Sequence, residues 1–185
     1  MTIAVAPEAF TMVDFDRAEI TKVAEQVAAE VGLGRQLISL EIDERSPLSR
    51  IAVRSIDPIE ITVEGGAFED LRRIRQLSPV RVVDGLGLHL LQIHDRLDPA
   101  FGAPPLDADL PLAHRVAWEV YAMGRLARLG HRSQRQRRLY HFRNRHGFTD
   151  AADAAFDRLW DGQDLCWADI TSLSDQVRES GQVVG

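Results

Sequence analysis

An arginine-rich stretch in the C-terminal half is the most polarised part of this sequence. Residues 125–146 contain eight arginines, three histidines and no acidic residue. Arginines neutralise phosphates, and the interleaved rings of Tyr140 and Phe142 have the chemistry to stack on bases. Residues 132–147 are therefore the predicted working surface, and the candidate ligand- or anion-binding residues within it are Arg135, Arg137, Arg138, Tyr140, His141, Arg143, Asn144, Arg145 and His146.

The same arginines have a second explanation within the chain. Residues 147–185 hold eight acidic residues against two arginines, so this segment can pair with the basic segment before it. The net charge of −6 also has the wrong sign for a dedicated nucleic-acid binder. The partner expected at residues 132–147 is an anionic ligand or a protein, and nucleic-acid binding is a less favoured alternative.

His89 and His94 lie in a predicted helix and are the nearest approach to a metal site. A zinc-hydrolase helix carries two histidines four residues apart, with a glutamate beside the first as general base. Here Leu90 follows His89, and a spacing of five residues rotates the second side chain by about 140° around the helix. We therefore predict no metal ligand, no cofactor and no catalytic residue, with His94 paired to Asp98 and His89 facing solvent.

The order of predicted elements over residues 17–97 is a helix, antiparallel strands and a long helix, and it resembles the smallest zincin-type metalloproteases. The stretch His-Leu-Leu-Gln-Ile-His at 89–94 is similar to an eroded form of their His-Glu-x-x-His motif. Because the motif that carries the chemistry is absent, the resemblance implies a related shape. It leaves one alternative function open, a metal-dependent hydrolase fold with a degenerate motif.

Carboxylates on one predicted strand are a further candidate for chemistry. Glu60 and Glu64 share the polar face of that strand, and paired carboxylates can do acid–base work or hold a divalent ion. An alternating strand normally has a charged outer face, and Arg72 and Arg73 follow closely enough to neutralise it. We therefore expect these carboxylates to be a solvated face.

The N-terminal half is predicted to be a three-stranded antiparallel sheet covered by helices. Asp16 and Glu19 form a capping-box pattern before an amphipathic helix at 17–31. Apolar residues then alternate with polar ones in three segments with short links, which is typical of an antiparallel meander; the segments are 38–42, 51–54 and 59–64. The spacing of Phe68, Leu71 and Ile74 predicts a short helix, and Ser78-Pro79 begins a long one at 79–97.

The C-terminal half is predicted to be helical. Residues 112–129 are apolar on nearly every face, which indicates a buried central helix. Thr149 or Asp150 caps the next helix, which Gly162 ends, and Ile170 lies in the last one. The expected organisation is a loose arm at 1–15 and a single α+β domain at 16–185, with a sheet-and-helix half at 16–98 and a helical half at 110–180.

Composition limits the class of protein. An apolar fraction of 45% and a charged fraction of 27% are ordinary for a globular chain. Cys166 is the only cysteine, which excludes an intramolecular disulfide. The N-terminus lacks the basic region of a signal peptide, and no apolar run is long enough to cross a membrane. We expect a cytoplasmic, non-catalytic binding or scaffold protein.

Overall fold

The computed structural model describes residues 2–132 and 134–182. The chain divides into two compact units, which we call the sheet unit (residues 1–97) and the helical unit (residues 98–185). The boundary between the units lies between residues 97 and 98. The single domain at 16–185 stays a prediction, and each unit is described by itself.

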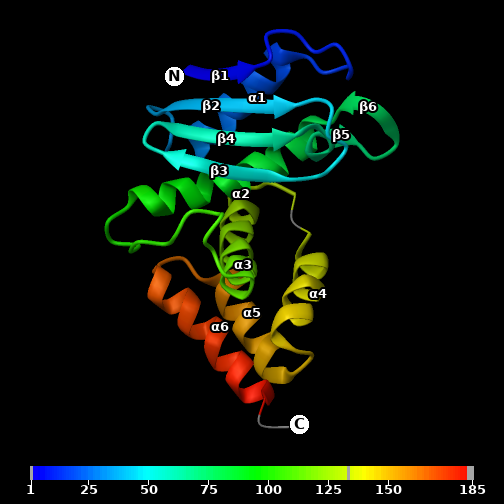
Figure 1. Ribbon diagram of the computed structural model, residues 1–185. Helices are drawn as coiled ribbons and strands as arrows, with labels where there is room; N and C mark the ends of the chain where they lie inside the picture. Colours follow the sequence, from blue (N-terminus) through cyan, green and yellow to red (C-terminus); the bar gives the residue numbers. More distant parts are fainter. Residues whose placement is uncertain (1, 133, 183–185) are drawn as a thin grey trace. The chain divides into compact units, whose positions relative to one another are not determined.

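The sheet unit contains a mixed four-stranded sheet within the described residues (Figure 1). The strands are β1 (Thr2–Ala6), β2 (Leu37–Asp43), β3 (Ile51–Ile56) and β4 (Ile59–Glu64), and their order across the sheet is β1-β2-β4-β3. β1 runs parallel to β2, β2 runs parallel to β4, and only β3 is antiparallel to its neighbour β4. The prediction of a three-stranded antiparallel meander is therefore wrong, although the mixed α+β class and the helical C-terminal half are confirmed.

Two features explain the difference from a meander. The link between β2 and β3 spans residues 44–50, and seven residues are long enough to cross two strand spacings, about 10 Å, which leaves room for one strand in between. β4 can then return between β2 and β3. β1 lies in the segment that was predicted to be a loose arm. In this segment Ile3 and Val5 are buried, and Ala4 between them is exposed.

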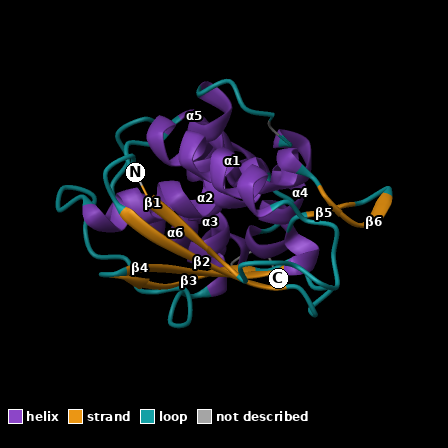
Figure 2. Cartoon of the chain, turned by 90° about the horizontal axis from the view of Figure 1, so that it is seen from above, coloured by secondary structure: helices purple, strands orange, loops and turns teal. Residues whose placement is uncertain are grey.

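Two helices cover one face of this sheet. They are α1 (Arg17–Glu30) and α2 (Pro79–Leu97), and they pack against each other and against the sheet; Figure 2 shows both on the same side of the strands. Asp16 accepts a hydrogen bond from the backbone N–H of Ala18 at 2.8 Å, as its capping role predicts. The other face of the sheet carries its polar side chains, because side chains alternate between the two faces along each strand.

The segment after β4 forms no regular α-helix. It contains a short 3₁₀ helix, η1 (Gly65–Ala67), and two short strands, β5 (Glu69–Asp70) and β6 (Arg73–Leu77). The predicted short helix is wrong, because only Phe68 of its three apolar residues is buried, while Leu71 and Ile74 are each 83% exposed. The Asp70 carboxylate accepts the backbone N–H of Arg72 at 2.7 Å, a local turn that competes with helix formation.

The helical unit packs its other helices against α3. Its elements are α3 (Leu112–Arg128), α4 (Arg135–His146), α5 (Asp150–Asp161) and α6 (Trp167–Gln182). α3 contacts each of the other three, and Trp118 and Tyr121 are buried on it as predicted. Thr149 caps α5 by accepting the backbone N–H of Ala152 at 3.1 Å. Of the helices described, none is both long and apolar enough to cross a membrane.

Candidate functional site

One side of α4 is held by acidic residues of its own unit. Arg135 contacts Asp157 of α5, Arg138 donates to Glu119 of α3 at 3.1 Å, and Arg143 makes a two-point contact with Asp153. We call Arg135, Arg138 and Arg143 the inner arginines. These pairs tie α4 to the helices beside it, so the inner arginines have a structural role.

The pair between Arg143 and Asp153 also changes the proton affinity of both groups. The hydrogen bond from Arg143 lowers the pKa of the Asp153 carboxyl below its ordinary value, and the same contact raises the pKa of Arg143. Both groups therefore stay charged over the pH range in which proteins work. The contact between Arg143 and Asp153 therefore persists over that range, and Arg143 stays occupied.

The opposite side of α4 (yellow in Figure 1) is exposed and basic. We call it the outer α4 face, and its residues are Arg137, Tyr140, His141, Asn144, Arg145 and Phe148, which follows the helix. On a helix of 3.6 residues per turn the first five fall within about 140° of the circumference. Among the described residues neither Arg137 nor Arg145 has an acidic partner, and the face carries no acidic side chain.

Two aromatic rings lie together on this face. Tyr140 and Phe148 are 58% and 63% exposed, and their ring centroids are 6.0 Å apart in an edge-on arrangement. Gly147 ends the helix with a positive φ of 100°, a conformation that favours glycine, and the chain then brings Phe148 back beside Tyr140. Phe148 was not among the predicted site residues; an aromatic directly after a helix-ending glycine is the signal that could have found it.

His146 was predicted at the site and is placed elsewhere. Its side chain is 3% exposed, and its ring stacks on Phe142 with 3.9 Å between centroids. Nδ1 donates to the Phe142 carbonyl at 3.1 Å, which leaves Nε2 to accept the hydroxyl of the buried Ser174 at 2.8 Å. His146 therefore joins α4 to α6 and does not belong to the outer α4 face.

This burial makes stability depend on pH. Burial lowers the pKa of His146 below its ordinary value, so the unfolded chain, with a value of about 6.5, binds a proton more readily than the folded protein. The contribution of His146 to the free energy of unfolding is therefore complete above pH ~6.5 and falls as the pH drops from there towards the lower folded pKa. Urea unfolding at a series of pH values measures this slope.

The matched variants for this prediction are His146→Gln and His141→Gln. His141 is exposed on the same helix, so its replacement should leave the pH dependence as it is in the parent protein. His146→Gln should lower stability near neutral pH and flatten the slope below it. A variant that kept the full slope would show that another group titrates.

Each of the two histidines of α2 contacts a group of its own helix. His89 donates from Nδ1 to the Gly85 carbonyl of its own helix at 2.8 Å. His94 lies 3.8 Å from the Asp95 carboxylate, rather than on the predicted Asp98. Across residues 2–132 and 134–182, no three His, Cys, Asp or Glu side chains converge as metal ligands would.

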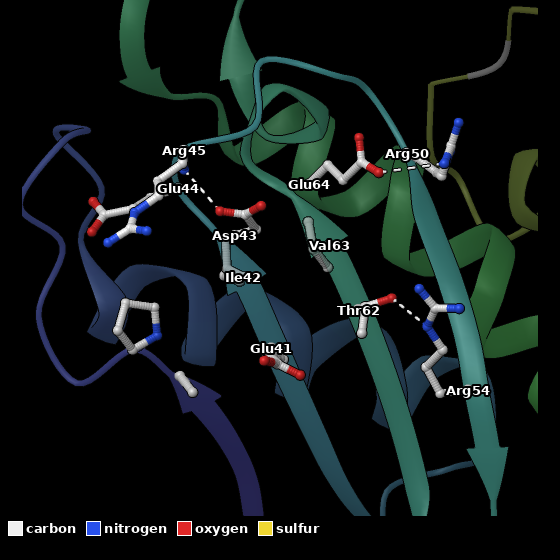
Figure 3. A pocket seen from close by; sticks show the side chains of 12 residues that line it. Glu41, Ile42, Asp43, Glu44, Arg45, Arg50, Arg54, Thr62, Val63 and Glu64 are labelled. Atoms are coloured by element: carbon white, nitrogen blue, oxygen red, sulfur yellow. Dashed lines mark hydrogen bonds and ion pairs between the residues drawn. The ribbon is translucent and has the colours of Figure 1, made fainter.

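A hollow of about 560 Å³ lies on the open face of the sheet (Figure 3). The ends of β1, β2 and β4 and the start of β3 line it, mostly with charged side chains. Glu64, one of the predicted carboxylates, lies here and contacts Arg50 at 3.6 Å and the Ser46 hydroxyl at 3.1 Å. Glu60 is exposed on the same strand, outside the hollow.

One carboxylate of this hollow has a structural task. Glu44 accepts the backbone N–H groups of Thr11 and Met12 at 2.8 and 2.7 Å. The bond from Met12 is the main reason that the pKa of Glu44 is lowered. Glu44 therefore ties the segment after β1 to the end of β2.

Protein-family models, curated proteins and solved structures were each compared with this chain, and none of them matches it. Its function must therefore be inferred from the residues and distances described above.

Proposed function

We propose that this protein is a non-catalytic binding domain whose working surface is the outer α4 face, and that its partner is an acidic segment of another protein. The observation that carries the proposal is the division of the arginines on one helix. The inner arginines are neutralised by acids of their own unit, whereas Arg137 and Arg145 face solvent on the same face as two exposed aromatic rings.

The composition of the outer α4 face supports a protein partner. Tyrosine and arginine are the residues that most often dominate binding energy at protein interfaces. Tyr140 and Phe148 offer apolar area beside a polar rim of His141 and Asn144. Exposed rings of this size are costly in water unless something covers them, so they are the expected anchors of the interface.

The helix geometry sets the length of the partner segment. Arg137 and Arg145 are eight residues apart, which is about 12 Å along an α-helix. An extended peptide covers that distance in about four residues. A segment with two acidic residues about four positions apart and an apolar residue between them would therefore meet both arginines and the aromatic pair.

Nucleic acid fits the same surface less well. Affinity for a phosphate backbone grows with the number of arginines that neutralise phosphates, and the inner arginines are already occupied. The chain carries a net charge of −6, which opposes approach to a polyanion. Two outer arginines on such a chain favour a short acidic segment over a long phosphate backbone.

A peptide selection tests the proposal. The probe is a display library in which two glutamates are fixed four positions apart and the remaining positions vary. We expect selected peptides to bind the full chain, with binding weakened about tenfold or more by Tyr140→Ala, because aromatic anchors carry most of the energy. Arg145→Glu should weaken it as well, and fluorescence anisotropy of labelled peptides measures both changes.

The matched control is Arg72→Glu. It makes the same change of charge at an exposed arginine of the sheet unit, so it should leave peptide binding unchanged. Peptides that bind the parent protein and the Tyr140→Ala variant equally would contradict the proposal. Tight binding of a single-stranded RNA oligomer that weakens steeply with salt would replace it with nucleic-acid binding.

A further inference from the structure

The hollow on the open face of the sheet lies where parallel strands end. β1, β2 and β4 point their carboxyl ends to the same edge, and residues at these ends line the hollow. Its volume of about 560 Å³ is in the range of small-ligand sites. Since α1 and α2 cover the other face, the side chains of this face are free to meet a ligand.

The hollow has unpaired groups of opposite charge on its two sides. Glu41 on β2 is exposed, and its carboxylate has no partner among the described residues. The carboxylate of Asp43, two positions further along the same face, accepts the backbone N–H of Arg45 at 3.0 Å and no other group within the described part of the chain. On the other side, Arg54 of β3 donates Nε to the Thr62 hydroxyl at 3.0 Å, and its two terminal nitrogens have no partner in the described chain.

A β-bulge sets the direction of Arg54. The register of β3 on β4 passes from Val53 opposite Ile61 to Ser55 opposite Glu60, so Arg54 is the extra residue of the bulge. Bulges of this kind redirect a side chain, and they are common beside binding sites. The hydrogen bond from Nε holds the guanidinium beside Thr62 of β4, which lies between Arg54 and Glu41 in this view (Figure 3).

The sheet sets the distance between the opposite charges. β4 lies between β2 and β3, so the backbones that carry Glu41 and Arg54 are two strand spacings apart, about 10 Å. Both residues line the hollow. A ligand that joins them must carry a cation and an anion within about 10 Å, which is the extended length of about three residues.

We propose that this hollow binds a small zwitterion the size of a di- or tripeptide, with its ammonium group at Glu41 and Asp43 and its carboxylate at Arg54. The two ends of the ligand are recognised separately, because each meets a group of opposite charge on a different strand. This site lies in the sheet unit and does not depend on the function proposed for α4.

Capped and uncapped triglycine separate the two contacts. The probes are triglycine, N-acetyl-triglycine, which lacks the ammonium group, and triglycine amide, which lacks the carboxylate. We expect triglycine to shift backbone amide resonances of β2, β3 and β4 in NMR titrations of the full chain. Each cap should weaken binding about fivefold, which is the upper range for one exposed ion pair.

Two variants assign each end of the ligand to its residue. When Glu41→Gln and Asp43→Asn are combined, the acetyl cap should no longer matter, while the amide cap still weakens binding. In Arg54→Gln the pattern should reverse. Glu60→Gln is the matched control, because Glu60 is exposed on β4 outside the hollow. The proposal is overturned if triglycine shifts no resonance on these strands, or if both capped peptides bind as well as triglycine does.

Discussion

Replacing Trp118 by alanine is expected to lower the free energy of unfolding by about 3–5 kcal/mol. Trp118 is fully buried, and its ring lies 5.7 Å from that of Phe101 and 5.3 Å from that of Trp167 between centroids. Removing the indole takes away a large apolar surface and leaves a cavity, because close-packed neighbours collapse only in part. Urea unfolding followed by circular dichroism measures the loss.

The control for this prediction is Leu129→Ala. Leu129 follows the last residue of α3 and is 47% exposed, so its loss should change stability by less than about 1 kcal/mol. Hydrogen exchange should show that Trp118→Ala loosens α3 and the helices packed on it. An unchanged denaturation midpoint for Trp118→Ala would contradict the central position of α3.

Gly124→Ala is expected to destabilise the protein by about 2 kcal/mol or more. A Cβ atom at Gly124 would lie 2.1 Å from the carbonyl oxygen of Trp160, and this obstacle is backbone that cannot rotate away. Alanine favours a helix over glycine by about 1 kcal/mol, which would stabilise α3 alone. The overlap outweighs that gain, because α3 and α5 must separate to relieve it.

Separation of these helices would also strain a second contact. Arg128 of α3 donates to the carbonyl oxygens of Trp160 and Gly162 at the end of α5. These bonds hold the same turn of α5 that a methyl group at Gly124 would push away. The loss of stability should therefore be accompanied by faster hydrogen exchange at the end of α5.

Gly85→Ala is the matched comparison, since it adds the same methyl group to another helix. Its Cβ would meet the terminal carbon of Ile51 at 2.6 Å, and a flexible side chain can move at little cost. The helix-forming gain should then be retained, so we expect a change near zero or a slight stabilisation. Equal destabilisation by Gly124→Ala and Gly85→Ala would show that close backbone approach is not the cause.

The helices of this protein were predictable from sequence because their signals are local. Asp16 and Thr149 cap the helices that follow them, as the patterns of the sequence predict. Apolar residues recur at helical spacing along α1, α2 and α3, and most of them are buried. A cap or an apolar stripe depends on residues within a few positions, so it can be read without the rest of the fold.

The arrangement of the strands was decided by tertiary structure. The alternation of residues 38–42 and 59–64 predicts strands, and both exist. It does not say that β4 lies between β2 and β3, or that the first residues add a parallel edge strand. Strand order depends on pairing between residues far apart in sequence, and alternation is the same in parallel and antiparallel neighbours.

The candidate sites show the same division between local and distant causes. The sequence by itself determined that residues 132–147 are basic, and it predicted pairing with the acids that follow. Only the packing of α4 against α3 and α5 decided which arginines are inner, which are outer, and that His146 is buried. The hollow is likewise lined by Glu41 and Arg54 from separate strands. An arginine or a histidine has the same chemistry on every face of a helix. Its role depends on the residues that lie beside it, and only the tertiary structure determines which residues those are.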